Sequence, residues 1–178
     1  MDRVSPSEGE GWWFEPTRAR QFLDGRPLPH DDGFMKLALE QARRAERAGE
    51  VPVGAVVVIG GQVISRGRNV REACNDVAGH AEIVALRRAA RSRRDWRFDG
   101  ATVYVTLEPC PMCVGAMLSV RVKRLVYGAA DPRAGAAGTV LNLADYPGLP
   151  HHLDVVSGIR ADECAQLMRI FFARRRVH

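Results

Sequence analysis

Four residues in the middle of the chain have side chains that can bind a metal ion and transfer protons. His80 and Glu82 stand in the stretch GHAEI, and Cys110 and Cys113 follow in LEPCPMCVG. Imidazole and thiolate are common zinc ligands, and a carboxylate beside a bound water can act as a general base. Because catalytic zinc sites usually keep one position open for water, three ligands favour a catalytic zinc site.

Two other interpretations of the cysteines stay open at this stage. A strand followed by C-x-x-C at the start of a helix also suits a redox dithiol, because the helix N-terminus stabilises a thiolate. Cys74, six residues before His80, could supply a fourth ligand and make the site structural. Glu82 taken alone could be a carboxylate that complements a helix dipole. Beside three zinc ligands it favours metal-assisted hydrolysis, since zinc lowers the pKa of a bound water to about 7.

The hydrophobic pattern predicts the elements that position these residues. Apolar residues at helical spacing from Phe34, with Gly49 as a stop, predict a first helix, and Gly60-Gly61 between two β-branched runs predicts a hairpin. Later strands alternate with helices, which implies parallel pairing there and a mixed sheet with helices on both faces. The other predicted elements are helices from about His80, from Pro111 to Leu118 and around Cys164 to Phe172, and strands over 101–107, 123–129 and 153–158.

Length and composition predict one α/β domain. The chain has 178 residues with 46% hydrophobic content, which suits a single core. We expect residues 1–32 to form a flexible N-terminal arm and residues 33–178 to form the domain. The chain shows neither an apolar run of about 20 residues nor a signal sequence, so the sequence predicts a cytoplasmic protein.

The charge is distributed unevenly along the chain. Residues 1–32 contain four basic and seven acidic residues, whereas the remainder contains 22 basic and 14 acidic residues. Nearly all of the basic residues are arginines, which suits bidentate contact with phosphate but could equally reflect nucleotide bias in the genome.

Several stretches resemble one family. H-x-E followed by P-C-x-x-C is the signature of zinc-dependent nucleobase deaminases. From about Phe34 to Arg176 the chain resembles the bacterial tRNA-specific adenosine deaminases, in the stretches VPVGAVVV, GRN, GHAEIVALR, ATVYVTLEPCPMCVGAM, RLVYGAADPRAGAAG, YPGLPHH and ADECAQLMRIFFARRR. The resemblance implies a three-layer α/β/α cytidine-deaminase-like fold with a five-stranded mixed sheet. It also implies a homodimer with one zinc ion per subunit. The expected activity is hydrolytic deamination of the wobble adenosine of a tRNA anticodon, in an arginine tRNA, to inosine by zinc-activated water.

The same resemblance assigns metal and catalytic roles to the four residues. His80, Cys110 and Cys113 would hold the zinc ion, and Glu82 would transfer protons.

Five further residues are expected to contact the substrate by this resemblance. Asn69 matches the asparagine that recognises the flipped base, and Asp131 matches an aspartate that touches the neighbouring nucleotide. Val53, Ala81 and Leu107 match positions that line the adenine pocket.

The chain departs from the family where RNA is expected to lie. The departures are the stretch VAG at residues 77–79, Ala130 and Pro150, and they leave the chemical residues in place. The alternatives that remain open are a free-base or nucleotide deaminase of the guanine or cytosine type and a zinc-stabilised RNA-binding module without activity.

Overall fold

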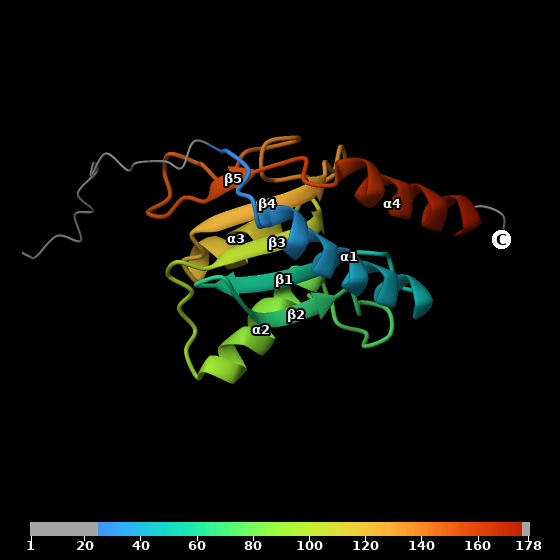
Figure 1. The fold of residues 1–178 in the computed structure, drawn as a ribbon, viewed down its shortest axis with the longest axis horizontal. Coiled ribbons are helices and arrows are strands. Elements are labelled where there is room, and N and C mark those ends of the chain that lie inside the picture. The colour runs from blue at the N-terminus through green and yellow to red at the C-terminus, as the bar shows by residue number, and fades with distance from the viewer. Residues whose placement is uncertain (1–24, 176–178) are drawn as a thin grey trace, which may run out of the picture.

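The computed structural model describes residues 25–175, and these contain every helix and strand that the sequence predicts (Figure 1). The elements are, in chain order, α1 (Asp31–Arg47), β1 (Gly54–Ile59), β2 (Gln62–Arg68), α2 (Ala81–Arg93), β3 (Thr102–Leu107), α3 (Pro111–Ser119), β4 (Arg124–Ala129), β5 (Asp154–Val156) and α4 (Ala161–Arg175).

The strands form one five-stranded mixed sheet in the order β2-β1-β3-β4-β5. Strand β1 pairs antiparallel with both β2 and β3, whereas β4 is parallel to β3 and to β5. Gly60 and Gly61 form the predicted two-residue turn, with φ angles of +57° and +77° that favour glycine. The predicted antiparallel hairpin and later parallel pairing are both confirmed.

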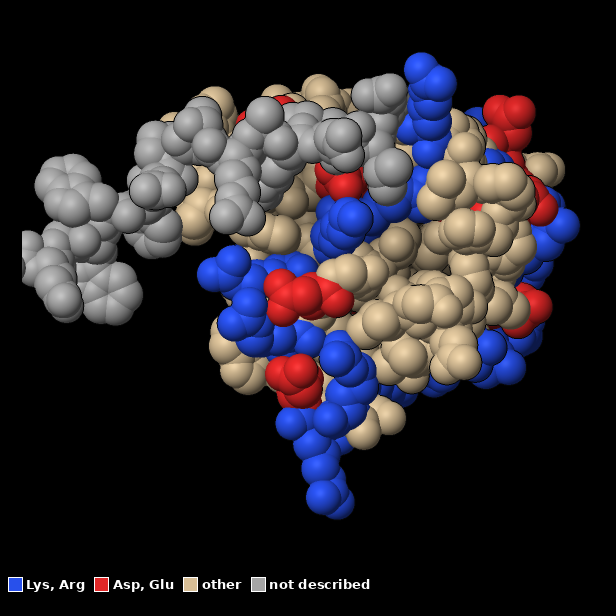
Figure 2. Space-filling view, turned by 60° about the vertical axis from the view of Figure 1, so that its left-hand side comes forward, with Lys and Arg blue, Asp and Glu red and all other residues tan. Residues whose placement is uncertain are grey.

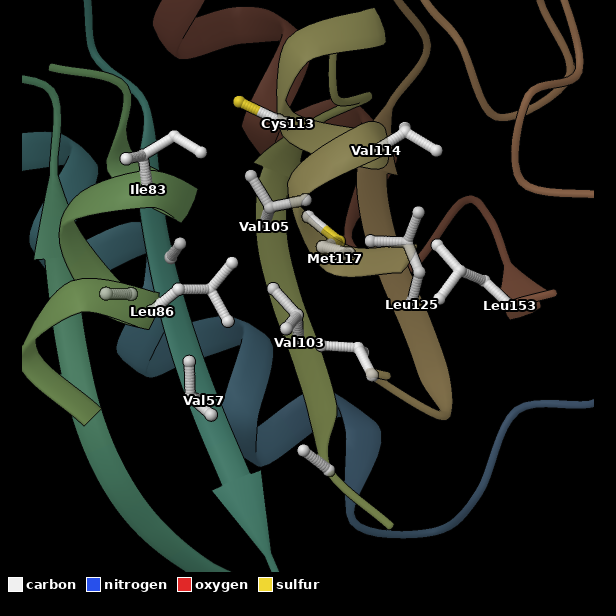
Figure 3. Close-up of a cluster of buried hydrophobic side chains, with 14 of the residues drawn as sticks. Val57, Ile83, Leu86, Val103, Val105, Cys113, Val114, Met117, Leu125 and Leu153 are labelled. Atoms are coloured by element: carbon white, nitrogen blue, oxygen red, sulfur yellow. The ribbon is translucent and has the colours of Figure 1, made fainter. Parts of the chain in front are cut away.

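Helices cover both faces of the sheet and give the predicted three layers (Figure 1). One hydrophobic cluster joins the sheet to α2 and α3, and a second joins it to α1 and α4. Figure 3 shows side chains from α2, α3 and the strands meeting in the first cluster, with Cys113 and Ile83 at the same end of it. No helix among residues 25–175 is long and apolar enough to cross a membrane.

A close approach between α2 and β2 fixes where α2 begins. A Cβ atom on Gly67 would lie 2.1 Å from the carbonyl oxygen of Ala81 and 2.6 Å from the backbone nitrogen of Ala85. Only glycine therefore allows the first turn of α2 to rest on the strand. This contact places His80, the residue before the helix, at the edge of the sheet.

Helix α1 begins before the predicted boundary between residues 32 and 33. Asp31 starts α1 and is buried; its carboxylate accepts hydrogen bonds from Leu28 N at 2.7 Å, from the hydroxyl of Tyr104 at 2.8 Å and from two guanidinium nitrogens of Arg124 at 2.7 Å each. The predicted boundary thus falls inside α1, because Arg124, 93 residues away, pairs with Asp31 and allows this polar residue to be buried. Residues 1–24 of the predicted arm lie outside the described residues.

Candidate active site

Two helix N-termini meet at one edge of the sheet and carry the predicted metal ligands. His80 precedes α2 with extended torsion angles (φ −71°, ψ 148°), and Cys110 precedes α3 in the same way (φ −74°, ψ 170°). Pro111 occupies the first turn of α3, where its missing N–H breaks no helical hydrogen bond. Cys113 lies in the first turn of α3, and its Sγ is within 4.8 Å of the ligand atoms of His80 and Cys110.

The ligand atoms have the spacing that a tetrahedral zinc ion requires. His80 Nδ1 lies 3.6 Å from Cys110 Sγ and 3.5 Å from Cys113 Sγ. Zinc bonds of usual length, at a tetrahedral angle, would separate nitrogen from sulfur by about 3.6 Å. Among residues 25–175, this is the one group of three or more His, Cys, Asp or Glu side chains close enough to share an ion. Cys74 is exposed and does not belong to this group, so the closed structural site is not supported.

The environment of the cysteines favours a metal-binding thiolate. A hydrogen bond from Cys113 and a second from His80 lower the pKa of Cys110 to about 4, against the effect of burial. The hydrogen bond with Cys110 also raises the pKa of His80. The pKa of Cys113 is raised, because Cys113 donates to Cys110 and is buried. Since the thiolate is the metal-binding form of cysteine, Cys110 is ready to accept an ion at neutral pH.

Glu82 is a buried carboxyl beside the ligand group. Its side chain is 3% exposed and lies in the first turn of α2, two residues after His80. Burial raises the pKa of Glu82 above its usual value, and the neighbouring His80 and Cys113 oppose that rise. A carboxyl whose pKa moves toward neutrality can both take up and release a proton during a reaction.

A single cavity of about 340 Å³ joins the ligand group, Glu82 and the predicted substrate contacts. This volume is within the range of about 300–1,000 Å³ that is usual for small-molecule sites. Its lining contains all five residues that we expected to contact the substrate: Val53, Asn69, Ala81, Leu107 and Asp131. Every predicted site residue lines this cavity except Cys113, which is buried and whose Sγ lies 3.5 Å from His80 Nδ1.

Helix α4 supplies part of the cavity wall, although the sequence predicted only a helix over these residues and no site residue among them. Met168 and Phe172 line the cavity, whereas Cys164 and Phe171 of the same helix are buried. The guanidinium of Arg133 lies 5.6 Å from the centre of the Phe172 ring.

A buried carboxylate that the sequence analysis missed shapes the loop containing Asp131. Glu108 is 2% exposed and accepts hydrogen bonds from the backbone N–H groups of Asp131 at 3.1 Å, Ala137 at 3.0 Å and Thr139 at 3.1 Å. The hydroxyl of Thr139 also donates to it. Asp131 in turn accepts a hydrogen bond from the backbone N–H of Arg133 at 2.9 Å. The position of Asp131 at the cavity is therefore set by Glu108.

The surface carries many cationic side chains, because residues 33–178 contain 22 basic and 14 acidic residues. Figure 2 shows Lys and Arg side chains projecting from several edges of one face, with smaller acidic groups between them. Arg71 and Arg133 stand at the cavity itself. Positive charge of this kind attracts polyanions and speeds their encounter with the protein.

The mixed sheet and its three-ligand site define the class of zinc-binding deaminase domains. Residues 29–129 match the family model described as the cytidine and deoxycytidylate deaminase zinc-binding region. The ligand geometry agrees with this match. Because His80 joins the two cysteines in one group, the structure favours a zinc site over a redox dithiol.

Relatives narrow this class further. The chain is 44% identical to a tRNA-specific adenosine deaminase of Bacillus subtilis (strain 168), over 84% of the chain and 92% of that relative. A solved structure from work on A-to-I editing by tRNA:A34 deaminases superposes with a TM-score of 0.74 at 44% identity, covering 76% of the chain and 98% of that structure. A guanine deaminase structure from Bacillus subtilis gives a TM-score of 0.56 at 37% identity, over 61% and 69% of the two chains. The chain belongs to the family of tRNA-specific adenosine deaminases.

We expect Cys110→Ser to remove the zinc ion. The wild-type protein should contain close to one zinc per chain, and the variant much less, because a serine hydroxyl is a far weaker zinc ligand than a thiolate. Metal analysis of the purified proteins measures this. Cys74→Ser is the matched control and should keep its zinc, since Cys74 is exposed and outside the ligand group. Full zinc content in Cys110→Ser would contradict the ligand assignment.

Proposed function

We propose that this protein hydrolyses the wobble adenosine of a tRNA anticodon, that of an arginine tRNA, to inosine and ammonia. The observation that carries the proposal is the shared cavity, in which two of the proposed ligands, His80 and Cys110, and the carboxyl of Glu82 face the five proposed substrate contacts. The names of the relatives support adenosine in tRNA as the substrate.

Glu82 is the proposed proton carrier of the reaction. Zinc, held by His80, Cys110 and Cys113, supplies activation of a water molecule near neutral pH when it is bound. Glu82 takes a proton from the attacking water and delivers it to N1 of the adenine as the C6–O bond forms. It then transfers the second proton to the amine, and the C6–N bond breaks to release ammonia. Its burial suits this role, because a raised pKa allows the carboxyl to hold the proton between the two steps.

The remaining cavity residues hold the base in place. Val53, Ala81 and Leu107 provide apolar walls, and Asn69 provides a polar group beside them. An adenosine in an anticodon loop leaves its stack at lower cost than a base in a duplex, which favours a loop position as the substrate. Asp131 lies at the same cavity and is the proposed contact for the neighbouring nucleotide.

We also propose that two copies of the chain associate and that the protein acts in the cytoplasm, where its proposed substrate is used. Exposed apolar side chains support association: Met112 of α3 is 40% exposed, and Val140 and Leu141 are 52% and 44% exposed. Where such side chains form one contiguous patch, a partner commonly covers them.

A substrate panel tests the proposed activity. The zinc-loaded protein is incubated with an arginine anticodon hairpin that has adenosine at the wobble position, and separately with free adenosine, guanine and cytosine. We expect inosine and ammonia from the hairpin alone, with a KM that rises steeply between 50 and 200 mM salt because phosphate contacts release counterions. A second hairpin with a different anticodon, also carrying adenosine at the wobble position, tests the preference for arginine tRNA.

Two outcomes of the panel would contradict the proposal. Ammonia from free guanine or cytosine, with no salt dependence and no reaction on the hairpin, would identify a free-base deaminase. Hairpin binding without ammonia from any substrate would identify a zinc-stabilised RNA-binding module.

A further inference from the structure

A second buried carboxylate, Glu50, lies next to the cavity and has no part in the mechanism above. It stands between α1 and β1 and is 2% exposed. One carboxylate oxygen accepts a hydrogen bond from Asn69 Nδ2 at 3.2 Å, and the other accepts one from the backbone N–H of Ala73 at 2.7 Å. A buried carboxylate is costly unless its oxygens have donors, so both contacts are needed to keep Glu50 in this position.

The contact with Glu50 determines which end of the Asn69 amide faces it. A carboxylate accepts hydrogen bonds and cannot donate them, whereas an amide has a donor nitrogen and an acceptor oxygen that can exchange places by rotation. The Nδ2 group must therefore point to Glu50. The backbone of Asn69 is held separately, since its N–H donates to the carbonyl of Val53 at 3.0 Å. The amide consequently has one preferred orientation.

The oxygen of the same amide is left for the cavity. Asn69 lines the cavity, and within residues 25–175 its Oδ1 has no hydrogen-bond partner. Oδ1 is not enclosed by protein atoms, so it is accessible from the cavity. An accessible acceptor in a substrate cavity is suited to a donor on the substrate, either an N–H of the base or an O–H of the ribose.

We propose that Glu50 is a positioning residue, which holds the Asn69 amide so that Oδ1 accepts a hydrogen bond from an N–H or O–H group of the bound nucleoside. The proposal rests on the proposed function, because it needs Asn69 to contact the substrate. Through Ala73 the same carboxylate also holds the segment of residues 70–79, which leads directly to His80. Glu50 thus orients the polar contact of the cavity and steadies the loop beside it.

Glu50→Gln tests the proposal with little change of shape. A glutamine at this position can donate to Asn69 Oδ1 and allow the amide to turn its nitrogen toward the cavity. We expect kcat/KM for the wobble-adenosine hairpin to fall by about tenfold to a hundredfold, the scale of one lost hydrogen bond in a buried site, mainly through KM. Zinc content and melting temperature should stay close to those of the wild type. Glu40→Gln, the same chemical change on the exposed side of α1, is the control and should leave kcat/KM unchanged.

A double-mutant cycle with Asn69→Ala separates positioning from a structural role. If Glu50 acts through Asn69, Glu50→Gln should cause little further loss in the Asn69→Ala background. The proposal would be overturned if Glu50→Gln lowered kcat/KM by the same factor in both backgrounds or kept full activity. Loss of zinc or of folding in Glu50→Gln would also overturn it. Asn69→Ala with normal kcat/KM would instead remove the assigned substrate contact of the proposed function, so the two failures are distinguishable.

Discussion

Glu82→Gln should nearly abolish deamination while leaving the zinc site and the fold intact. Glutamine has almost the same shape as glutamate but cannot carry a proton between the attacking water and the leaving amine. General acid–base groups contribute about 10²–10⁴-fold to rates, so we expect a loss of this size in single-turnover inosine formation. The fold should persist, because burial already favours an uncharged group at this position.

Two measurements show whether the loss in Glu82→Gln is chemical. The variant should contain the same zinc per chain as the wild type and should bind the wobble-adenosine hairpin with similar affinity. Wild-type turnover by a fully zinc-loaded Glu82→Gln protein would remove Glu82 from the proposed mechanism.

Asp31→Ala should lower the free energy of unfolding by about 3–5 kcal/mol, because the change leaves a buried guanidinium without its partner. The side chains of Asp31 and Arg124 are 1% and 4% exposed. Urea unfolding followed by circular dichroism measures the loss. Asp32→Ala is the matched control at the next residue: its carboxylate is 54% exposed and pairs with Lys36 and Arg160, so its loss should be much smaller.

The effect of Asp31 should also depend on pH. Burial alone would raise the pKa of Asp31, but hydrogen bonds from Arg124, the Leu28 N–H and Tyr104 outweigh burial and lower it. A lowered pKa in the folded state stabilises the protein above the unfolded pKa of about 3.9 and loses that contribution as the pH falls toward the folded value. The difference between wild type and Asp31→Ala should therefore shrink below about pH 4. If Asp31→Ala and Asp32→Ala lowered the free energy of unfolding equally at neutral pH, the buried Asp31–Arg124 pair would not have the stabilising role assigned to it.

The chemical centre was predictable because few residue types perform this chemistry. His80 and Cys110 each end a loop and precede a helix, and Cys113 lies in the first turn of α3, so their local sequence predicts their placement. The hairpin was predictable for a similar reason, since Gly60-Gly61 determines the turn locally.

The residues that the sequence did not reveal depend on distant partners. Asp31 is buried through Arg124, Glu50 through Asn69 and Ala73, and Glu108 through backbone groups 23 to 31 residues later. Buried carboxylates are rare enough that charge alone suggests an exposed side chain. Only the folded chain shows where the compensating N–H groups lie.

The contacts of Glu108 link the loop that contains Asp131 to the peptide that precedes Cys110. Glu108 stands two residues before Cys110, and its carboxylate holds the loop that contains Asp131 and Thr139. A library that varies this loop to change the RNA preference is therefore also expected to disturb the peptide that leads to Cys110, one of the proposed metal ligands. Variants with new RNA preferences should be screened for metal retention, and the loop positions that donate to Glu108 are best left out of the randomised set.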